Sequence, residues 1–205
     1  MGAMSVSAAP GPSDPISVRD QVVRATYACI ARFGMAKTTV EDVVKESGLS
    51  RATIYRHFPG GREELLHEAV GWQVAEFFVR LADHVRDAPD LIHLLDDGLA
   101  FARRALVEHE LLQRILQTEP ERLLGLLTTE STKTLPFIAD YLHPSLERER
   151  AAGRLRAGVD VDDAADHLAR LILSYIGGPG WADLDNPAER RDLVERELLG
   201  GILAG

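Results

Sequence analysis

The sequence predicts an all-α protein, and three observations support this prediction. Apolar residues recur at helical spacing through most of the chain. No segment alternates apolar and polar residues over a strand length with turn residues at both ends. Capping residues, glycines and prolines mark the ends of the helical stretches. We therefore expect about nine helices and no sheet.

The N-terminal part of the chain contains three short helical stretches and a long one. The first begins at Ser17, which forms an approximate capping box with Asp20, and it ends before Gly34, a natural C-terminal glycine. Gly48 ends the second stretch in the same way. The expected ranges are about 17–33, 39–47, 50–57 and 62–86.

The C-terminal part is expected to be helical as well. Pro89 interrupts the pattern after the fourth stretch, and Pro120 suits a first helical position. Pro136 and Pro144 should bend or delimit the helix in which they lie. The expected ranges are about 90–107, 108–117, 120–129, 132–151, 161–176 and 187–203.

Charge is distributed unevenly over the 205 residues, which carry a formal net charge of −9. Residues 16–66 hold eight Lys/Arg and six Asp/Glu, a balance of +2, which leaves −11 for the rest. Only this basic part could lie comfortably on a polyanion. We expect a disordered tail at 1–15, a first helical domain at 16–62 and a second at 63–205.

Composition favours a cytoplasmic protein. Apolar runs fall far short of the ~20 residues that span a bilayer, and residues 1–15 lack the basic and apolar regions of a signal peptide. Cys29 is the only cysteine, so an intramolecular disulfide is impossible and a reducing compartment fits. Cys29 itself is expected in the core of the first helix.

The second and third helices together have the pattern of a helix-turn-helix. Gly48 can adopt the left-handed conformation that reverses the chain, Leu49 can fill the corner, and Ser50 can cap the next helix. Two short helices joined by such a turn are typical of DNA-binding proteins. Small helical corners also occur in proteins that never meet DNA.

The third helix divides into two faces at 100° per residue. Ile54 and Phe58 share the inner face, and Tyr55 borders it. The opposite face suits a DNA major groove, because it presents a small residue, a guanidinium, a hydroxyl and an imidazole. Those residues are Ala52, Arg56, Thr53 and His57.

Phosphate contacts are expected around this helix. Thr38 and Thr39 lie at a helix N-terminus, where free amides favour an anion. Tyr55 can give its hydroxyl to a phosphate, and Arg62 opens the next helix. The full candidate DNA-binding set is Thr38, Thr39, Ser50, Arg51, Ala52, Thr53, Tyr55, Arg56, His57 and Arg62.

Two stretches, ATYACIARFG and TTVEDVVKESGLSRATIYRHFPGGREEL, closely resemble the DNA-binding domain of tetracycline-repressor (TetR) family transcription regulators. The resemblance covers about fifty residues, near a quarter of the chain. The family usually has one residue fewer before the basic residue that opens the fourth helix, where this chain has Pro59-Gly60-Gly61 before Arg62. The positions that carry the resemblance are Gly34, Thr38-Thr39-Val40, Gly48-Leu49-Ser50 and Ile54-Tyr55-Arg56-His57-Phe58.

The resemblance implies a homodimer in which the last two helices of each subunit form a four-helix bundle. A two-fold protein binds a pseudo-palindromic DNA operator. A core role is the alternative for each interface candidate. The candidates are Leu168, Leu171, Ile172, Tyr175, Val194, Leu198 and Ile202.

The resemblance also implies a pocket for a small, largely hydrophobic effector in the second domain, and we expect a repressor that this effector releases from its operator. A core role is again the alternative for each apolar candidate. The apolar candidates are Trp72, Phe77, Phe78, Phe101, Leu112, Ile115 and Phe137, and the polar ones are His109, Gln113 and Tyr141.

An enzyme is not expected. The pairs His93/Asp97 and Asp163/His167 have i,i+4 spacing, but a metal site needs three or four ligands, so neither a metal nor a cofactor is expected. No phosphate loop, nucleophile elbow or dinucleotide fingerprint occurs. Two alternatives stay open: a helical dimer that binds a small molecule without binding an operator, and an enzyme built on the acidic domain.

Overall fold

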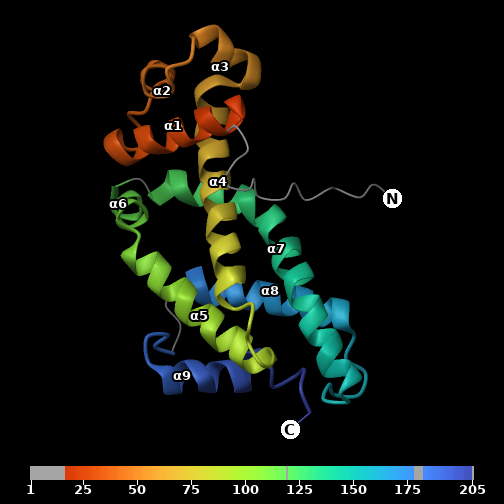
Figure 1. The fold of residues 1–205 in the computed structure, drawn as a ribbon. Coiled ribbons are helices and arrows are strands. Elements are labelled where there is room, and N and C mark those ends of the chain that lie inside the picture. The colour runs from red at the N-terminus through yellow and green to blue at the C-terminus, as the bar shows by residue number, and fades with distance from the viewer. Residues whose placement is uncertain (1–16, 119, 178–181, 205) are drawn as a thin grey trace. The chain divides into compact units, whose positions relative to one another are not determined.

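The computed structural model describes residues 17–118, 120–177 and 182–204, and within them the chain is all-α, as predicted (Figure 1). The predicted tail at 1–15 lies outside the described residues. The only β contact in the described part is an isolated antiparallel bridge between Leu155 and Leu203. The helices are α1 Val18–Phe33, α2 Val40–Ser47, α3 Arg51–His57, α4 Gly61–His84, α5 Leu91–Glu108, α6 Glu110–Thr118, α7 Pro120–Ala151, α8 Val161–Gly177, α9 Pro187–Asp192 and the π-helical turn Leu193–Leu198.

The chain forms two compact units, the first ending at Val70 and the second beginning at Gly71. We call them the head and the body. Leu65, Leu66 and Ala69 of α4 are buried, and they belong to the head. The division thus falls inside α4, further along the chain than the boundary expected at residue 62.

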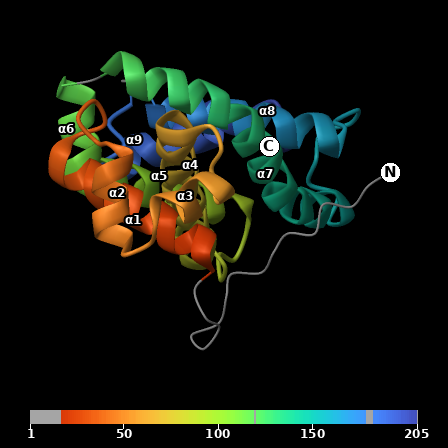
Figure 2. The same cartoon turned by 90° about the horizontal axis from the view of Figure 1, so that it is seen from above.

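In the head, α1, α2 and α3 lie together in both views (Figures 1 and 2). Each helix begins with a hydroxyl cap that satisfies a free backbone amide. Ser17 accepts from the N–H of Asp20, and Ser50 accepts from the N–H of Thr53. Gly48 ends α2 in the left-handed conformation, with φ 69° and ψ 10°, as the helix-turn-helix pattern predicts. The fully buried residues of the head include Val22, Cys29, Ile30, Met35, Ile54, Phe58 and Leu65.

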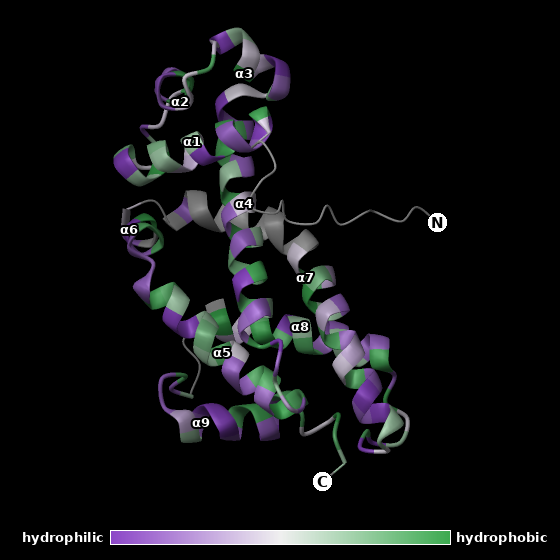
Figure 3. Cartoon of the chain, viewed as in Figure 1, coloured by the Kyte–Doolittle hydropathy of each residue, from purple (hydrophilic) through white to green (hydrophobic). Residues whose placement is uncertain are grey.

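The body has a core formed by α5, α7, α8 and the π-helical turn, together with the part of α4 beyond residue 70. Hydrophobic and hydrophilic residues follow one another along these helices, so each can turn an apolar face inward (Figure 3). No helix among the described residues has the length and apolarity needed to cross a membrane. The largest fully buried side chains of the body are Leu91, Leu99, Leu142, Leu146, Leu168, Leu193 and Leu198.

One long helix, α7, replaces the two helices expected at 120–129 and 132–151. It continues through Pro136 and Pro144, which were expected to bend or delimit a helix. Both prolines lie on the exposed side of α7. The backbone carbonyl that each ring leaves without its helical partner can turn toward water on that side, so the helix persists.

The C-terminal helix also differs from its expected form. A single helix was expected to about residue 203, but α9 ends at Asp192 and continues as the π-helical turn. The chain then pairs with the segment after α7. The N–H of Arg156 donates to the carbonyl of Ile202 at 2.9 Å, and the N–H of Ala204 donates to that of Arg154 at 2.8 Å. These bonds fix the end of the chain to the body.

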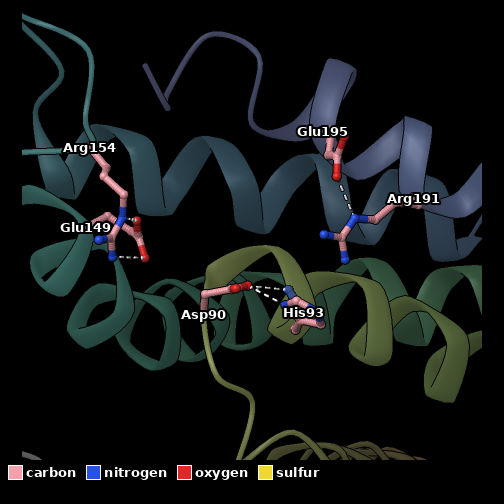
Figure 4. A network of polar contacts seen from close by, with 6 residues as sticks. All are labelled: Asp90, His93, Glu149, Arg154, Arg191 and Glu195. Carbon is pink, nitrogen blue, oxygen red and sulfur yellow. Dashed lines mark hydrogen bonds and ion pairs between the residues drawn. The ribbon is translucent and has the colours of Figure 1, made fainter. Parts of the chain in front are cut away.

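Polar contacts connect side chains of the body (Figure 4). Asp90 caps α5 and lies 2.7 Å from Nδ1 of His93. Burial raises the pKa of the Asp90 carboxyl, but the hydrogen bonds from His93 outweigh burial and leave that pKa lowered. Arg154 binds the buried Glu149 with two bonds of 2.6 and 3.1 Å. A carboxylate this deeply buried needs such a partner.

Candidate nucleic-acid interface and cavity

The two predicted faces of α3 are present. Ile54 and Phe58 are completely buried, so they attach the helix to the rest of the head. Ala52 and Arg56 are exposed on the other side, and Tyr55, which borders the inner face, is exposed as well. A helix held on one face and open on the other can enter a major groove. Thr53 and His57 are half-buried and lie at the margin.

Two exposed arginines of α3 differ in what they bind. Arg51 forms an ion pair with Glu41 of α2, and its guanidinium lies 5.4 Å from the centre of the Tyr55 ring. Arg56 is exposed and makes no hydrogen bond or ion pair within the described parts of the head. Arg56 is therefore ready to bind, whereas Arg51 must first leave Glu41.

The hydroxyls of Thr53 and of the cap Ser50 lie within hydrogen-bonding distance of each other. Ser50 Oγ lies 2.9 Å from Thr53 Oγ1, and it also accepts from the Thr53 N–H at 3.1 Å. A hydroxyl can donate one bond and accept two. Thr53 thus keeps capacity for a base edge or a phosphate.

The start of α2 already holds an acid. Thr39 Oγ1 donates to Asp42 Oδ2 at 2.6 Å, and the Thr39 N–H donates to the same oxygen at 3.0 Å. These bonds lower the pKa of the Asp42 carboxyl. Thr38 is buried, and its hydroxyl donates to the Gly34 carbonyl at 2.7 Å. Thr39 is exposed as a phosphate ligand requires, whereas the side chain of Thr38 is placed for packing.

Arg62 points into the head rather than away from it. Its Nε donates to the Thr38 carbonyl at 2.7 Å, and its Nη2 donates to the carbonyls of Met35 and Ala36 at 2.6 and 3.1 Å. Its Nη1 forms an ion pair with Glu63. Every nitrogen of the guanidinium is engaged, so the predicted phosphate contact is not supported by this geometry.

The body contains a cavity of about 50 Å³, partly open to solvent, between α4, α5, α7 and α8. Tyr141 supplies the only polar side chain among the lining residues, and its hydroxyl donates to the Ala82 carbonyl at 3.1 Å. Burial raises the pKa of Tyr141. Such walls suit an uncharged, apolar molecule. The lining residues are Phe78, Leu81, Ala82, Val85, Leu94, Leu95, Gly98, Leu99, Phe137, Ile138, Tyr141, Leu142, Ile172 and Ile176.

Three predicted pocket residues line this cavity: Phe78, Phe137 and Tyr141. The polar candidates His109 and Gln113 bind within the body instead. His109 Nδ1 accepts from the N–H of Leu112 at 3.1 Å, and Gln113 Nε2 donates to the Leu106 carbonyl at 2.8 Å. The candidates outside the cavity lining are Trp72, Phe77, Phe101, His109, Leu112, Gln113 and Ile115.

Comparison with known proteins supports a DNA-binding role for the head, as its geometry does. Residues 22–69 match the family model described as bacterial regulatory proteins, tetR family. The match spans the second turn of α1 through the third turn of α4, and it includes the whole helix-turn-helix. The chain belongs to the TetR family.

Relatives of this TetR-family regulator span both units. The HTH-type transcriptional repressor KstR2 of Mycolicibacterium smegmatis is 28% identical and covers 93% of each chain. The structure of the TetR-family repressor AlkX from Dietzia is 26% identical, with a TM-score of 0.58 over 90% of this chain and 96% of that one. Salmonella enterica GusR, 23% identical with a TM-score of 0.58 over 93% and 98%, shares the fold. TetR-family proteins are non-enzymatic transcription regulators that bind DNA and small-molecule effectors.

Most of the interface residues predicted from the TetR resemblance are buried inside a single chain. Burial within one chain favours the core role for these residues, which are Leu168, Ile172, Val194, Leu198 and Ile202. Leu171 and Tyr175 are half-buried. For all seven residues, the interface role stays a prediction.

Two residues of α1 hold the TetR helix-turn-helix in place and were missed in the sequence. Arg19 Nη1 donates to the carbonyl of His57 at 3.1 Å, and its guanidinium lies 4.6 Å from the centre of the Phe58 ring. Gln21 Nε2 donates to the carbonyl of Ser47 at 2.8 Å. Both satisfy carbonyls at helix ends. Their positions on the polar side of α1 gave no signal, because a solvated polar face is the ordinary expectation there.

Proposed function

We propose that this TetR-family regulator is a homodimeric, cytoplasmic repressor that binds a pseudo-palindromic operator and leaves it when a small, largely hydrophobic effector binds the body. The observation that carries the proposal is α3, which is attached through Ile54 and Phe58 while Arg56 stays exposed and unengaged. Arginine on guanine is the commonest specific contact in a major groove.

Sequence reading and affinity are expected from different residues. Arg56 and Ala52 lie on the exposed face of α3, where they could reach base edges. Thr39, Tyr55 and Arg51 lie around that face and could contact phosphates, which supply most of the affinity and fix the register. This division supports a protein that discriminates between DNA sequences.

The chemistry of the cavity supports an apolar effector. No charged side chain lines it, so a charged group would enter without a partner, which is costly. Two relatives named above are repressors, and one of them, AlkX of Dietzia, is implicated in biodegradation of n-alkanes. We therefore expect an effector without a net charge, carrying at most a few hydrogen-bonding atoms.

The proposed coupling runs through α4. This helix extends from Gly61 to His84 without interruption, and the cavity is lined by residues near its C-terminal end. An effector that shifts α4 would change the separation of the two α3 helices in a dimer. The effector acts only through a difference in affinity between the two arrangements, so the operator must reduce effector affinity by the same factor.

Fluorescence anisotropy with the DNA upstream of the protein's own gene tests the proposal. We expect salt-sensitive binding that weakens when N-phenyl-1-naphthylamine, an uncharged fluorescent probe, occupies the cavity. Gly98→Leu should block the probe, because a side chain at Gly98 extends toward Leu81 and Val85 on the cavity wall. Gly98→Ala is the matched control and should leave room for the probe.

Each alternative predicts a different result. A chain that binds the probe but no DNA at any salt concentration would be a helical small-molecule binder without operator function. Probe affinity that is the same with and without operator would contradict the coupling through α4. Oligomeric state, measured by light scattering, tests the dimer separately.

A further inference from the structure

Three backbone carbonyls of the turn between α1 and α2 converge on one side chain. They belong to Met35, Ala36 and Thr38, and the side chain is Arg62 of α4, 24 to 27 positions away along the chain. Met35 and Thr38 are each 1% exposed. Carbonyls in such a setting need a partner from the protein.

The turn before α4 directs Arg62 toward these carbonyls. The Gly61 N–H donates to the Phe58 carbonyl at 3.0 Å, which closes a turn over Pro59 and Gly60. Gly61 has φ +63°, and a Cβ there would lie 3.3 Å from the Tyr55 ring. Glycine is therefore favoured at this position, because another residue would be strained there. The additional residue in Pro59-Gly60-Gly61 is accommodated in this turn.

Lysine could not replace this arginine. The guanidinium is planar and presents its donors in a fixed fork, so Nε and Nη2 reach different carbonyls at the same time. A lysine ammonium carries its three donors on one nitrogen, so it could not occupy the separate positions of Nε and Nη2 at the same time. The geometry depends on the shape of the group and not on its charge alone.

We propose that Arg62 is a positioning residue, which ties the first turn of α4 to the turn at 35–38 and thereby sets the N-terminus of α2 for DNA. This inference rests on the proposed DNA-binding function. Arg62 then supports affinity through geometry, with no phosphate contact of its own. Thr39, directly after the tied segment, is the residue whose position depends on it.

The test compares Arg62→Lys and Arg62→Gln in the full chain, with a 30-base-pair random-sequence duplex as the DNA probe. We expect both variants to weaken binding by about tenfold, because both lose most of the hydrogen bonds. The slope of log Kobs against log salt should stay at the wild-type value. Affinities are to be measured at a temperature where circular dichroism finds each variant fully helical.

Arg51→Lys and Arg51→Gln are the matched controls, since Arg51 is exposed and is one of the residues expected to contact phosphates. Arg51→Gln should reduce the magnitude of the salt slope by about 0.9 for each phosphate that the side chain no longer neutralises, whereas Arg51→Lys should keep the slope. Arg62→Lys that binds like wild type, or Arg62→Gln with a reduced slope, would mean that Arg62 is a phosphate ligand and would overturn the inference.

Hydrogen exchange separates this inference from the proposed function. In both Arg62 variants we expect the amides of residues 35–40 to exchange at least about tenfold faster, while those of the body stay unchanged. Unchanged exchange at 35–40 would refute the tie even if DNA binding fell. A wild-type chain that bound no DNA would contradict the proposed function and leave the exchange result to decide whether the tie exists.

Discussion

The two helices of the helix-turn-helix are neighbours of similar length, yet the charges at their N-termini are opposite. Helix α2 has two acids in its first turn, and Asp42 closes a capping box with Thr39. Helix α3 has no acid in its first turn, has a neutral cap at Ser50 and begins with Arg51. A cation at a helix N-terminus is unfavourable, whereas an anion there is favourable.

The difference indicates where an external anion is needed. The positive end of α2 is already neutralised by its own side chains. At the positive end of α3, Arg51 forms an ion pair with the carboxylate of Glu41 in α2. A DNA phosphate could take the place of that carboxylate, so the helix that lacks its own anion is the one expected to approach DNA.

The largest difference should be in stability. Ile54 is the one buried residue within α3, whereas α2 buries Val40, Val43 and Ser47. We expect Ile54→Ala to lower the free energy of unfolding by about 2–5 kcal/mol, and Val43→Ala by about 2 kcal/mol. Urea unfolding followed by circular dichroism measures both. Equal losses would mean that the two helices are anchored alike.

The next largest effect should be on the affinity for DNA. Arg56→Ala should cost about 1–3 kcal/mol on a cognate site and relax preference at one base pair. Lys45→Ala, which removes the last-turn cation of α2, is the control and should change affinity little. Tyr55→Phe should weaken binding to all sequences alike, as expected of a phosphate contact. An equal loss for Arg56→Ala on cognate and random DNA would make Arg56 a phosphate contact too.

The contributions of the two caps to stability should depend differently on pH, and this effect should be smaller. The folded-state pKa of Asp42 is lowered by its bonds with Thr39, so its stabilisation is present above the unfolded carboxyl pKa, about 3.9. It is lost as pH falls through the lower, folded-state pKa. The melting temperature of Asp42→Asn should therefore lie below wild type at neutral pH and meet it in acid. Ser50→Ala, which removes a neutral cap, should be destabilised by a similar amount at both pH values.

The smallest effect should be a gain in DNA affinity. Glu41→Gln frees Arg51, so DNA affinity should rise by about two- to fivefold, the range expected for an exposed ion pair. Glu46→Gln makes the same change in net charge. Glu46 pairs with Arg32 of α1, so this substitution should give a smaller gain in DNA affinity. If Glu41→Gln still strengthened binding in an Arg51→Gln background, the gain would be a general charge effect.

Local patterns in the sequence predicted much of the fold and little of the long-range contacts. The two faces of α3, its cap and the left-handed Gly48 follow from helical spacing and turn chemistry, which neighbouring residues decide. The inward direction of Arg62 depends on carbonyls 24 to 27 positions away, and helical spacing carries no information about them. A basic residue at a helix start is equally consistent with a phosphate contact.

The apolar stripe of the last helix gave a similar ambiguity. Val194, Leu198 and Ile202 share one face, but spacing alone cannot tell a face that meets its own chain from one that meets a second copy. Burial within a single chain favours the core. The cavity was found only in part for the same reason: lining residues such as Gly98 and Ile176 become neighbours through the packing of α5 and α8.

The π-helical turn at Leu193–Leu198 has a consequence for insertions and deletions. Two buried apolar pairs, Leu193-Val194 and Leu198-Leu199, are separated by three exposed charged residues. The pairs thus repeat after five positions, which suits the i→i+5 bonding of a π-turn and not the four of an α-helix. Deleting Arg196 would restore an α-helical repeat without moving either pair off the buried face. We therefore expect a chain that lacks Arg196 to keep both pairs in the core.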